Sequence, residues 1–282
     1  MNNSRNWYIS EFPESLYPCN PQYRKSYTDA VIRGHSIAED SSVLICGVAR
    51  NVSQVLPYTI ARINKLVSYF SYYTVYIYEN DSEDTTLSTL REWEKLDKNV
   101  HLESEILGFD KNVSEVGHER TVRMAYCRNQ YLAFARKRLE DYDYVIVLDT
   151  DLKGGWSYHG ILNSIGHDLD IVGSNGLFYR KVDKDKDDRC RLFYDSWAFR
   201  HLGHNKPHIL EEINLLTYNR GESPIQVGSC FGGLAVYKWN VLNNDCVYKS
   251  GDCDHPTLHK QLVERGYEVY LNPSQITLYN WV

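Results

Sequence analysis

The sequence predicts an α/β protein with a mostly parallel sheet flanked by helices. Over the first 150 residues, apolar runs typical of buried strands alternate with amphipathic helix patterns, and several of these runs end directly in charged side chains. Alternation of this kind predicts a doubly wound parallel sheet whose strands have their carboxyl ends on one rim. Ligands of such sheets bind outside the carboxyl ends of the strands, so we expect the functional side chains there.

The composition is that of an ordinary soluble protein: 282 residues, 43% hydrophobic, 24% charged, with a net charge of -6. Because it has no block of Lys and Arg, we expect no nucleic-acid partner. No apolar run reaches the roughly 18 residues of a transmembrane segment, and the polar start predicts no signal peptide. We therefore expect a cytoplasmic protein, or a soluble domain that lacks its membrane anchor. Seven scattered cysteines, without a Cys-x-x-Cys pair, predict reduced thiols.

The elements of the first half follow from apolar spacing. Residues 1–40 predict an N-terminal arm with one helix near 27–37, and residues 41–282 predict a single domain. Apolar runs predict strands, whereas apolar residues at intervals of three and four predict helices. In chain order we expect a strand at 43–49, a helix at 56–70, a strand at 74–78, a helix around 87–93, an edge strand at 99–103, a helix at 119–139 and a strand at 144–149.

The second half has shorter elements. Two short strands are expected at 171–173 and 177–179, and a last strand at 267–271, after a helix that opens near residue 254. The strand-like run 226–237 is interrupted by glycines at 228, 232 and 233, where a ligand can approach the backbone.

The clearest candidate site follows the strand that ends at Leu148. Asp149 and Asp151 lie one residue apart, just before the flexible pair at 154–155. Two neighbouring carboxylates repel each other unless a cation lies between them, and their hard oxygen ligands suit a divalent metal ion. A plain polar turn remains the alternative, because short acidic turns are common. The first two strands also end in charged residues, Arg50 and Glu79, on the same rim.

Two other patterns are better explained without catalytic chemistry. His201, His204 and His208 lie in a stretch rich in Asn, Lys and Pro, where surface histidines are more common than metal ligands. Segment 228–232 has the Gly-x-Cys-x-Gly spacing of a nucleophile elbow, but that motif needs a helix after it. The apolar run that follows predicts a strand instead.

Several motifs together resemble the GT-A class of nucleotide-sugar glycosyltransferases, and within it the fungal capsule-associated mannosyltransferases of the cryptococcal type. They are VARN at 48–51, YENDS at 78–82 with DT at 84–85, RN at 128–129, LDTD at 148–151, FYDSW at 193–197, SCFGG at 229–233 and CDH at 253–255. The likeness covers roughly residues 43–275. The sequence departs from the family pattern in three ways. The family favours Glu where Asp254 stands, and its metal strand usually ends in an Asn-Asp type of sequence rather than Asp-Thr-Asp. The membrane anchor of a Golgi-type enzyme is also missing.

The resemblance implies a GT-A fold: a Rossmann-like, mostly parallel sheet with a smaller antiparallel part on the acceptor side. The halves would be 41–155 for the nucleotide and 156–282 for the acceptor. It also implies metal-dependent transfer of a hexose, with retention, from a nucleotide-sugar to a glycan acceptor. GDP-mannose is the favoured donor and a UDP-sugar the alternative.

The same resemblance assigns roles to individual residues. Asp149, Asp151 and His255 would bind Mn²⁺ or Mg²⁺. The nucleotide would contact Ala49, Arg50, Glu79, Asp81, Asp84, Arg128 and Asp149. For the acceptor hydroxyl, an inverting enzyme would need a nearby carboxylate, with Asp195 or Asp254 as candidates and Asp195 preferred for acceptor contact, whereas a retaining enzyme can rely on the leaving phosphate. Aromatic residues that offer a face to a sugar are Trp156, Tyr194, Trp197 and Phe231.

Plainer explanations of these residues stay open. His255 suits a helix cap or a core position, Arg128 suits a solvated helix face, and Asp84 suits a helix N-cap. Two other functions also remain. A sugar-nucleotide nucleotidyltransferase should carry a Gly-rich, basic loop after the first strand, which Ala49-Arg50-Asn51 does not supply. A catalytically silent carbohydrate-binding protein is distinguished only by an assay. The acceptor, the linkage and the oligomeric state are left undetermined.

Overall fold

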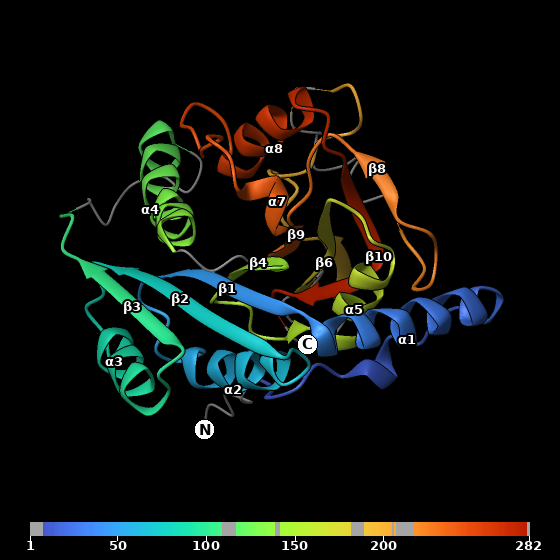
Figure 1. Cartoon of the computed structure of the whole chain (residues 1–282), viewed down its shortest axis with the longest axis horizontal. Coiled ribbons are helices and arrows are strands. Elements are labelled where there is room, and N and C mark those ends of the chain that lie inside the picture. Colours follow the sequence, from blue (N-terminus) through green and yellow to red (C-terminus); the bar gives the residue numbers. More distant parts are fainter. Residues whose placement is uncertain are drawn as a thin grey trace.

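The computed structural model describes residues 8–108, 117–138, 142–181, 189–204, 206 and 217–280. Its centre is one mixed sheet with the strand order β3-β2-β1-β4-β9-β6-β10-β5, in which β7 pairs with β6 and β8 pairs with β10. The expected α/β class is confirmed, with helices on both faces of the sheet (Figure 1).

The first part of the sheet is parallel, as the alternation of patterns predicts. β1 lies between β2 and β4, and β3 is the edge strand beyond β2. All four expected strands and all three expected helices are present. The bounds are β1 (Ser42–Ala49), α2 (Leu56–Val67), β2 (Tyr72–Asn80), α3 (Thr86–Leu96), β3 (Val100–Glu105), α4 (His118–Lys137) and β4 (Tyr144–Asp149).

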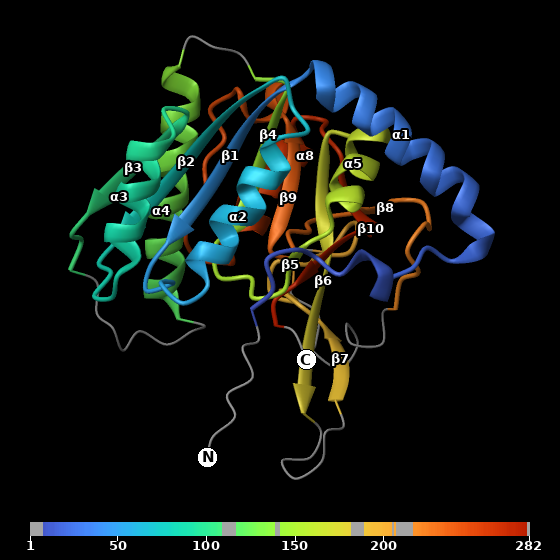
Figure 2. The same cartoon turned by 90° about the horizontal axis from the view of Figure 1, so that it is seen from below.

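The second part of the sheet is mixed, since β9 pairs antiparallel with both β4 and β6, whereas β10 runs parallel to β6. The β6–β7 hairpin extends beyond the other strands (Figure 2). The bounds are β5 (Gly155–Trp156), α5 (Tyr158–Gly166), β6 (Ile171–Lys181), β7 (Arg189–Phe193), β8 (Ile225–Val227), β9 (Leu234–Lys238), α7 (Trp239–Leu242), α8 (Asp254–Glu264) and β10 (Val269–Leu278).

Two strand predictions need correction. The two short strands expected at 171–173 and 177–179 are one continuous strand, because Asn175 and Gly176 stay paired with β10. The last strand is also longer than expected, since a register shift between Asn272 and Ile276 carries the pairing past Pro273.

Each face of the sheet has its own hydrophobic core. α2, α3 and α5 cover one face, where they pack over inward-facing residues such as Ile45 and Ile146. α4, α7 and α8 cover the other face, over residues such as Leu44 and Val147. Alternate residues of β1 and β4 therefore belong to opposite cores, which explains why both strands read as continuous apolar runs.

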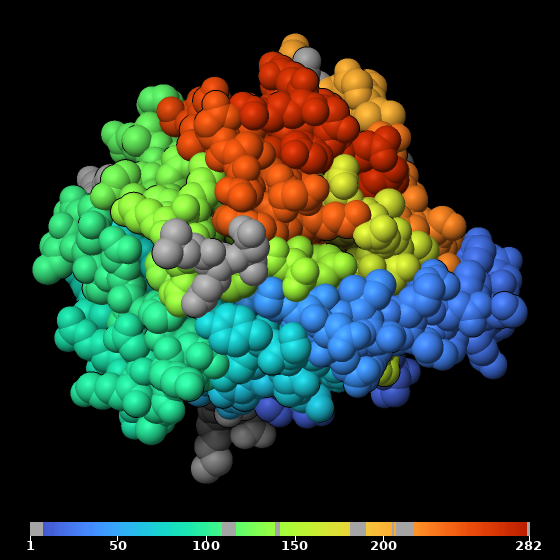
Figure 3. Space-filling model, viewed as in Figure 1, coloured from blue at the N-terminus to red at the C-terminus, as the bar shows by residue number. Residues whose placement is uncertain are grey.

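The segment before the sheet is integrated into the fold. The single-turn helices η1 (Glu14–Leu16) and η2 (Pro21–Tyr23) precede α1 (Arg24–Asp40), which lies against α5 (Figure 3). At their crossing, a Cβ added to Gly34 would lie 1.7 Å from the carbonyl oxygen of Leu162. Only glycine allows the two helices to approach so closely.

All seven cysteines are free thiols, as their spacing predicts. Over the described ranges, no helix combines the length and the apolar character that crossing a bilayer requires.

Candidate active site

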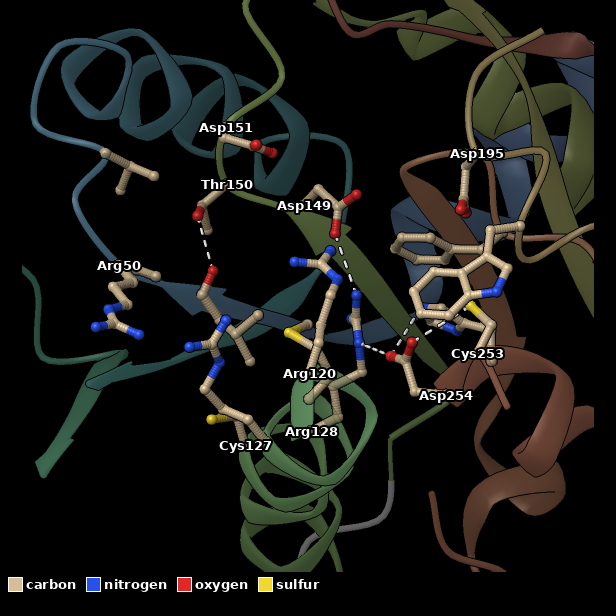
Figure 4. A pocket seen from close by; sticks show the side chains of 18 of the residues that line it. Arg50, Arg120, Cys127, Arg128, Asp149, Thr150, Asp151, Asp195, Cys253 and Asp254 are labelled. Carbon is tan, nitrogen blue, oxygen red and sulfur yellow. Dashed lines mark hydrogen bonds and ion pairs between the residues drawn. The ribbon is translucent and has the colours of Figure 1, made fainter. Parts of the chain in front are cut away.

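A pocket of about 310 Å³ lies at the carboxyl ends of β1 and β4. Such a position, at the rim where neighbouring strands end, is where open α/β sheets bind their ligands. Eight of the residues predicted to bind metal or nucleotide or to act on the acceptor line it: Ala49, Arg50, Arg128, Asp149, Asp151, Asp195, Asp254 and His255. Figure 4 shows how residues from distant parts of the chain converge there.

The loop that carries the paired aspartates is fixed by hydrogen bonds to its backbone. Asp149 donates its N–H to the carbonyl of Gly233 at 2.9 Å, so the end of β4 remains tied to the start of β9. Thr150 is buried between the aspartates and donates its hydroxyl to the carbonyl of Val48 at 2.8 Å. With Thr150 held inward, Asp149 and Asp151 face the pocket (Figure 4).

Arg128 is a buried cation between two carboxylates. Arg128, on α4, is only 3% exposed. The alternative explanation, that Arg128 lies on a solvated helix face, is therefore wrong. The guanidinium donates to Asp149 Oδ1 at 3.2 Å and forms an ion pair with Asp254, and it lies over the ring of Phe231. Arg128 therefore neutralises charge on both sides of the pocket.

The carboxylates of the pocket are crowded. Burial raises the pKa of Asp149 to about 6, although Arg128 lowers it, and the charge of Asp151 adds to the rise. Burial raises the pKa of Asp151 as well. The pKa of Asp195 is raised well above its usual value by burial and then by Asp149 and Asp254. A cation in this pocket would relieve the repulsion among these groups.

Asp195 also has an unusual backbone. Its φ of 63° lies in the left-handed region, which Asp adopts more readily than most residues. Its Oδ2 accepts the N–H of Gly232 at 3.3 Å. Residues held in this way are common at functional sites.

His255 is a buried imidazole near the start of α8. Its ring stacks on Phe231 with centroids 3.7 Å apart, and it meets the edge of Tyr248. Neither ring nitrogen has a hydrogen-bond partner in the described part of the chain. Burial, together with Arg128, holds the pKa of His255 well below its usual value, so the ring is neutral. A neutral imidazole keeps a lone pair for a metal ion.

The donor set therefore suits Mn²⁺ or Mg²⁺ chemically, because it combines the carboxylates of Asp149 and Asp151 with the unpartnered ring of His255. Within the described ranges, no three His, Cys, Asp or Glu side chains are already grouped as a metal site. These residues would have to move closer together to hold one ion.

Glu79 and Asp81 do not line the pocket. The carboxylate of Glu79 is buried and accepts hydrogen bonds from the Ser82 N–H at 2.9 Å and the Ser104 hydroxyl at 2.6 Å. Asp81 Oδ1 accepts the N–H of Gly108 at 2.9 Å, among other donors. Burial tends to raise the pKa of Asp81, but these hydrogen bonds lower it overall. Both residues fold the loop after β2, and their contact with a nucleotide stays a prediction.

Asp84 also organises a loop next to the pocket. Its carboxylate accepts the N–H of Thr86 at 2.9 Å and the N–H of Ser53 at 3.1 Å. Burial opposes ionisation, yet these hydrogen bonds lower the pKa of Asp84 to about 2. The side chain thus joins the start of α3 to the loop after β1. The N-cap of α3 is Thr85, so Asp84 lies one residue before the expected cap position, and it does not line the pocket.

Two charged residues that line the pocket, Arg120 and Arg123 on α4, were not predicted from the sequence. The spacing of Arg120, Arg123 and Arg128 places the three arginines on one side of a helix. This pattern could have predicted that they face the same site. Among the aromatic candidates, Tyr194, Trp197 and Phe231 line the pocket, and the hydroxyl of Tyr194 donates to Asp149 Oδ2 at 3.2 Å. Trp156 is fully buried elsewhere.

The nucleophile-elbow pattern is excluded by the structure, whereas the histidines are only located by it. Cys230 is buried and is followed by β9 rather than a helix, so segment 228–232 is no nucleophile elbow. His201 and His204 do not line the pocket, and His208 lies outside the described residues.

Comparison with known proteins agrees with this fold. The family model of cryptococcal mannosyltransferase 1 matches residues 42–264. No functionally curated protein matches the sequence. The mannosyltransferase PcManGT from Pyrobaculum calidifontis, solved in complex with GDP-Man and Mn²⁺, is similar in structure, with a TM-score of 0.50 and 13% identity over 91% of this chain and 66% of that one.

Two further structures are similar at lower scores. GalNAc-T7, solved with UDP, GalNAc and Mn²⁺, has a TM-score of 0.48 and 12% identity over 96% of this chain and 57% of its own. TarS 1-349 of S. aureus has a TM-score of 0.45 and 10% identity over 84% of this chain and 59% of its own. The chain thus spans less than two thirds of the length of these structures.

At these identities, structural similarity establishes the GT-A fold alone, whereas the family match covers most of the chain. All the residues that line the pocket, from Val48 to His255, lie within the matched range. The chain belongs to the cryptococcal mannosyltransferase 1 family of glycosyltransferases.

Proposed function

We propose that this protein is a metal-dependent glycosyltransferase that moves a hexose from a nucleotide-sugar to a glycan acceptor, with retention. The family favours mannose, and hence GDP-mannose, as the donor, with a UDP-sugar as the alternative. Residues 41–155 would bind the nucleotide and residues 156–282 the acceptor.

The observation that carries this proposal is the composition of the pocket. Two carboxylates at the end of β4 share it with a neutral, unpartnered imidazole and with arginines of α4. A nucleoside diphosphate is an anion that binds both divalent cations and arginine, so both kinds of group are needed around it. A core packed only for stability would not gather so many charges in one place.

Asp149, Asp151 and His255 would hold Mn²⁺ or Mg²⁺. When bound, the ion would neutralise negative charge on the diphosphate as it leaves. Ala49 and Arg50 at the end of β1, with Arg128, would contact the nucleotide. Glu79, Asp81 and Asp84 would shape the adjoining loops, since their carboxylates already accept hydrogen bonds there.

Asp195 and Asp254 would act on the acceptor side in different ways. Asp254 is paired with Arg128, so it would hold that arginine in place. Asp195 has a carboxylate facing the pocket from the segment after β7 (Figure 4). We assign it the hydrogen bond to the acceptor hydroxyl, whose proton would pass to an oxygen of the departing diphosphate in a retaining reaction.

The test is calorimetric titration with GDP, GDP-mannose, UDP and UDP-glucose, with and without Mn²⁺, on the wild type and on Asp151→Asn. We expect metal-dependent binding of one donor type, lost by at least tenfold in the variant because a neutral amide is a poorer metal ligand. Asp40→Asn changes the same chemical group at an exposed position at the end of α1 and should bind normally.

The outcomes separate the candidate functions. Binding to one nucleotide type that needs both Mn²⁺ and Asp151 supports the proposal and identifies the donor. If the folded wild-type protein binds none of the four ligands at high concentration, the glycosyltransferase proposal fails and a silent carbohydrate-binding role gains support. Formation of a sugar nucleotide from a sugar phosphate and a nucleoside triphosphate would instead indicate a nucleotidyltransferase.

A further inference from the structure

At its start, α4 directs two arginines toward the pocket and part of its apolar surface toward solvent, whereas its later turns bury apolar side chains such as Tyr131 and Leu132. Arg120 and Arg123 line the pocket, whereas Val122 and Tyr126 are 42% and 40% exposed. A helix stabilised only by packing shows the opposite arrangement, with apolar side chains inward and charges outward. This inverted pattern indicates that the arginines are placed for a ligand.

The third arginine of this group comes from β1. Arg50 lines the same pocket from the end of that strand, and all three side chains are half-buried rather than extended into solvent. The three guanidinium groups line one pocket, and burial lowers the pKa of Arg123, which the positive charges of Arg50 and Arg120 lower further. Like charges brought together within a pocket favour a shared anion.

Arg128 does not take part in this group, because its charge is already compensated by Asp149 and Asp254. In Figure 4 the side chain of Arg120 extends from α4 toward the strand end that carries Asp149 and Asp151, and Arg50 approaches from β1. The Nε of Arg120 is buried without a hydrogen-bond partner in the described residues. A donor left unpaired in this way is available to an anionic ligand.

We propose that Arg120 and Arg123, together with Arg50, form a phosphate-binding subsite that holds the diphosphate of the donor. This inference rests on the proposed function and adds two residues to it. The arginine fork matches phosphate oxygens in a bidentate manner. Without these cations, the four carboxylates of the pocket would repel a diphosphate.

The subsite would also assist the reaction. When the bond between the sugar carbon and the diphosphate oxygen breaks, the electron pair stays on that oxygen. The acceptor oxygen then bonds to the sugar carbon, and its proton passes to a phosphate oxygen. The arginines would stabilise the charge that develops on the departing diphosphate, in addition to the metal ion.

The test compares the affinities of ligands that differ only in their number of phosphate groups. The affinities of a nucleoside, its monophosphate and its diphosphate, with the base that the wild type selects, are measured calorimetrically with and without Mn²⁺. Arg120→Gln and Arg123→Gln should each lower the affinity for the diphosphate about tenfold. The affinity for the monophosphate should fall less, and that for the nucleoside should not change. Inorganic pyrophosphate should compete with the diphosphate in the wild type and lose affinity in the variants.

Arg91→Gln is the matched control, since Arg91 is exposed on α3 and does not line the pocket. Equal losses for nucleoside and diphosphate would overturn the inference, because they would indicate damage to the fold rather than a lost phosphate contact. Unchanged diphosphate affinity in both arginine variants would also overturn it, while the proposed function would stand. Failure of the wild type to bind any nucleotide would instead count against the proposed function itself.

Discussion

Individual residues of the pocket are explained by the partners that they have or lack. Arg128 is compensated on two sides by Asp149 and Asp254. His255, by contrast, is buried without any hydrogen bond to its ring nitrogens among the described residues. Because a buried polar atom without a partner costs free energy, such an atom indicates a ligand that completes the site.

Asp195 provides the first prediction at this scale. Asp195→Asn should raise the KM for the acceptor at least tenfold, since an amide is a weaker hydrogen-bond acceptor than a carboxylate. Nucleotide affinity should stay within about twofold, because Asp195 is not assigned to the donor.

A steady-state assay with varied acceptor, combined with nucleotide titration, measures both quantities. Asp168→Asn is the control: Asp168 also has a positive φ, of 56°, but is exposed and lies outside the pocket. An Asp195→Asn variant with an unchanged acceptor KM would remove Asp195 from the acceptor site.

A second residue, His259, makes stability depend on pH. The ring is fully buried between the hydroxyl of Ser229, 2.9 Å from Nδ1, and that of Tyr237, 2.8 Å from Nε2. Burial lowers the pKa of His259 to about 3 from the ordinary 6.5. The unfolded chain therefore binds the proton more readily than the folded one.

The free energy of unfolding should consequently decrease below pH 6.5, by up to about 1.4 kcal/mol per pH unit from this group. Denaturant titrations between pH 7 and 4 measure it. The free energy of unfolding of His259→Gln should depend less steeply on pH than that of the wild type. The control His35→Gln, at an exposed site on α1, should keep the pH dependence of the wild type. Parallel curves for the wild type and His259→Gln would show that His259 does not cause the effect.

The sequence predicted residues of the site unevenly, for a physical reason. Asp149 and Asp151 interrupt an apolar strand, so their placement is visible in the chain itself. Arg120 and Arg123 lie on a helix that carries many charges, and only the position of α4 over the sheet shows which of them face inward. Likewise, the sequence places Glu79 at the end of a strand on the rim of the sheet. It does not reveal that the Glu79 carboxylate accepts hydrogen bonds from Ser82 and Ser104.

Among the elements, α2 supports the loop that carries Asp151. The hydroxyl of Thr59 donates to the carbonyl of Thr150 at 2.9 Å. Arg62, which is fully buried, donates to the carbonyls of Leu152 at 2.6 Å and Lys153 at 2.7 Å. Side chains of one helix therefore satisfy three backbone carbonyls of the loop. The loop can keep its conformation without the hydrogen bonds of a regular strand or helix.

This arrangement predicts that Thr59→Val, which keeps the side-chain shape, should lower the affinity for Mn²⁺ in the presence of nucleotide several-fold. The loss follows from leaving the Thr150 carbonyl without its donor, at a stability cost of about 1–3 kcal/mol. Thr89→Val on α3 removes a hydroxyl that bonds within its own helix and serves as the control. If Thr59→Val reduces stability but leaves metal affinity unchanged, α2 supports the fold without positioning the metal loop.

The elements themselves were predictable to different degrees. β1, β2 and β4 are buried on both faces, so their apolar runs stand out clearly. β6 and β10 contain polar residues such as Ser174, Asn175 and Gln275, which are satisfied by hydrogen bonds inside the protein. Their pairing depends on contacts distant in sequence, and a local apolar pattern cannot show it.

At the scale of the whole molecule, the N-terminal segment joins parts that are far apart in sequence. Glu14 forms an ion pair with Arg220 at 2.6 Å and accepts the hydroxyl of Ser157 at 2.9 Å. The carbonyl of Ile9 accepts a hydrogen bond from Arg62 at 3.0 Å. Residues 8–40 thus contact α2, the start of α5 and the segment before β8, so they are packed against the rest of the domain.

The substitution Gly34→Ala distinguishes an integral α1 from a loosely attached arm by the sign of its effect. In an isolated helix, replacing glycine with alanine stabilises by about 1 kcal/mol, because glycine has the greater conformational freedom when unfolded. In this protein the added methyl would collide with the carbonyl of Leu162 on α5, and overpacking of this kind costs about 1–3 kcal/mol. We therefore expect Gly34→Ala to lower the free energy of unfolding in denaturant titration, whereas Thr28→Ala, at an exposed position of the same helix, should leave it nearly unchanged. A stabilised Gly34→Ala protein would mean that α1 is not held against α5 in solution, and that residues 1–40 form a separable arm.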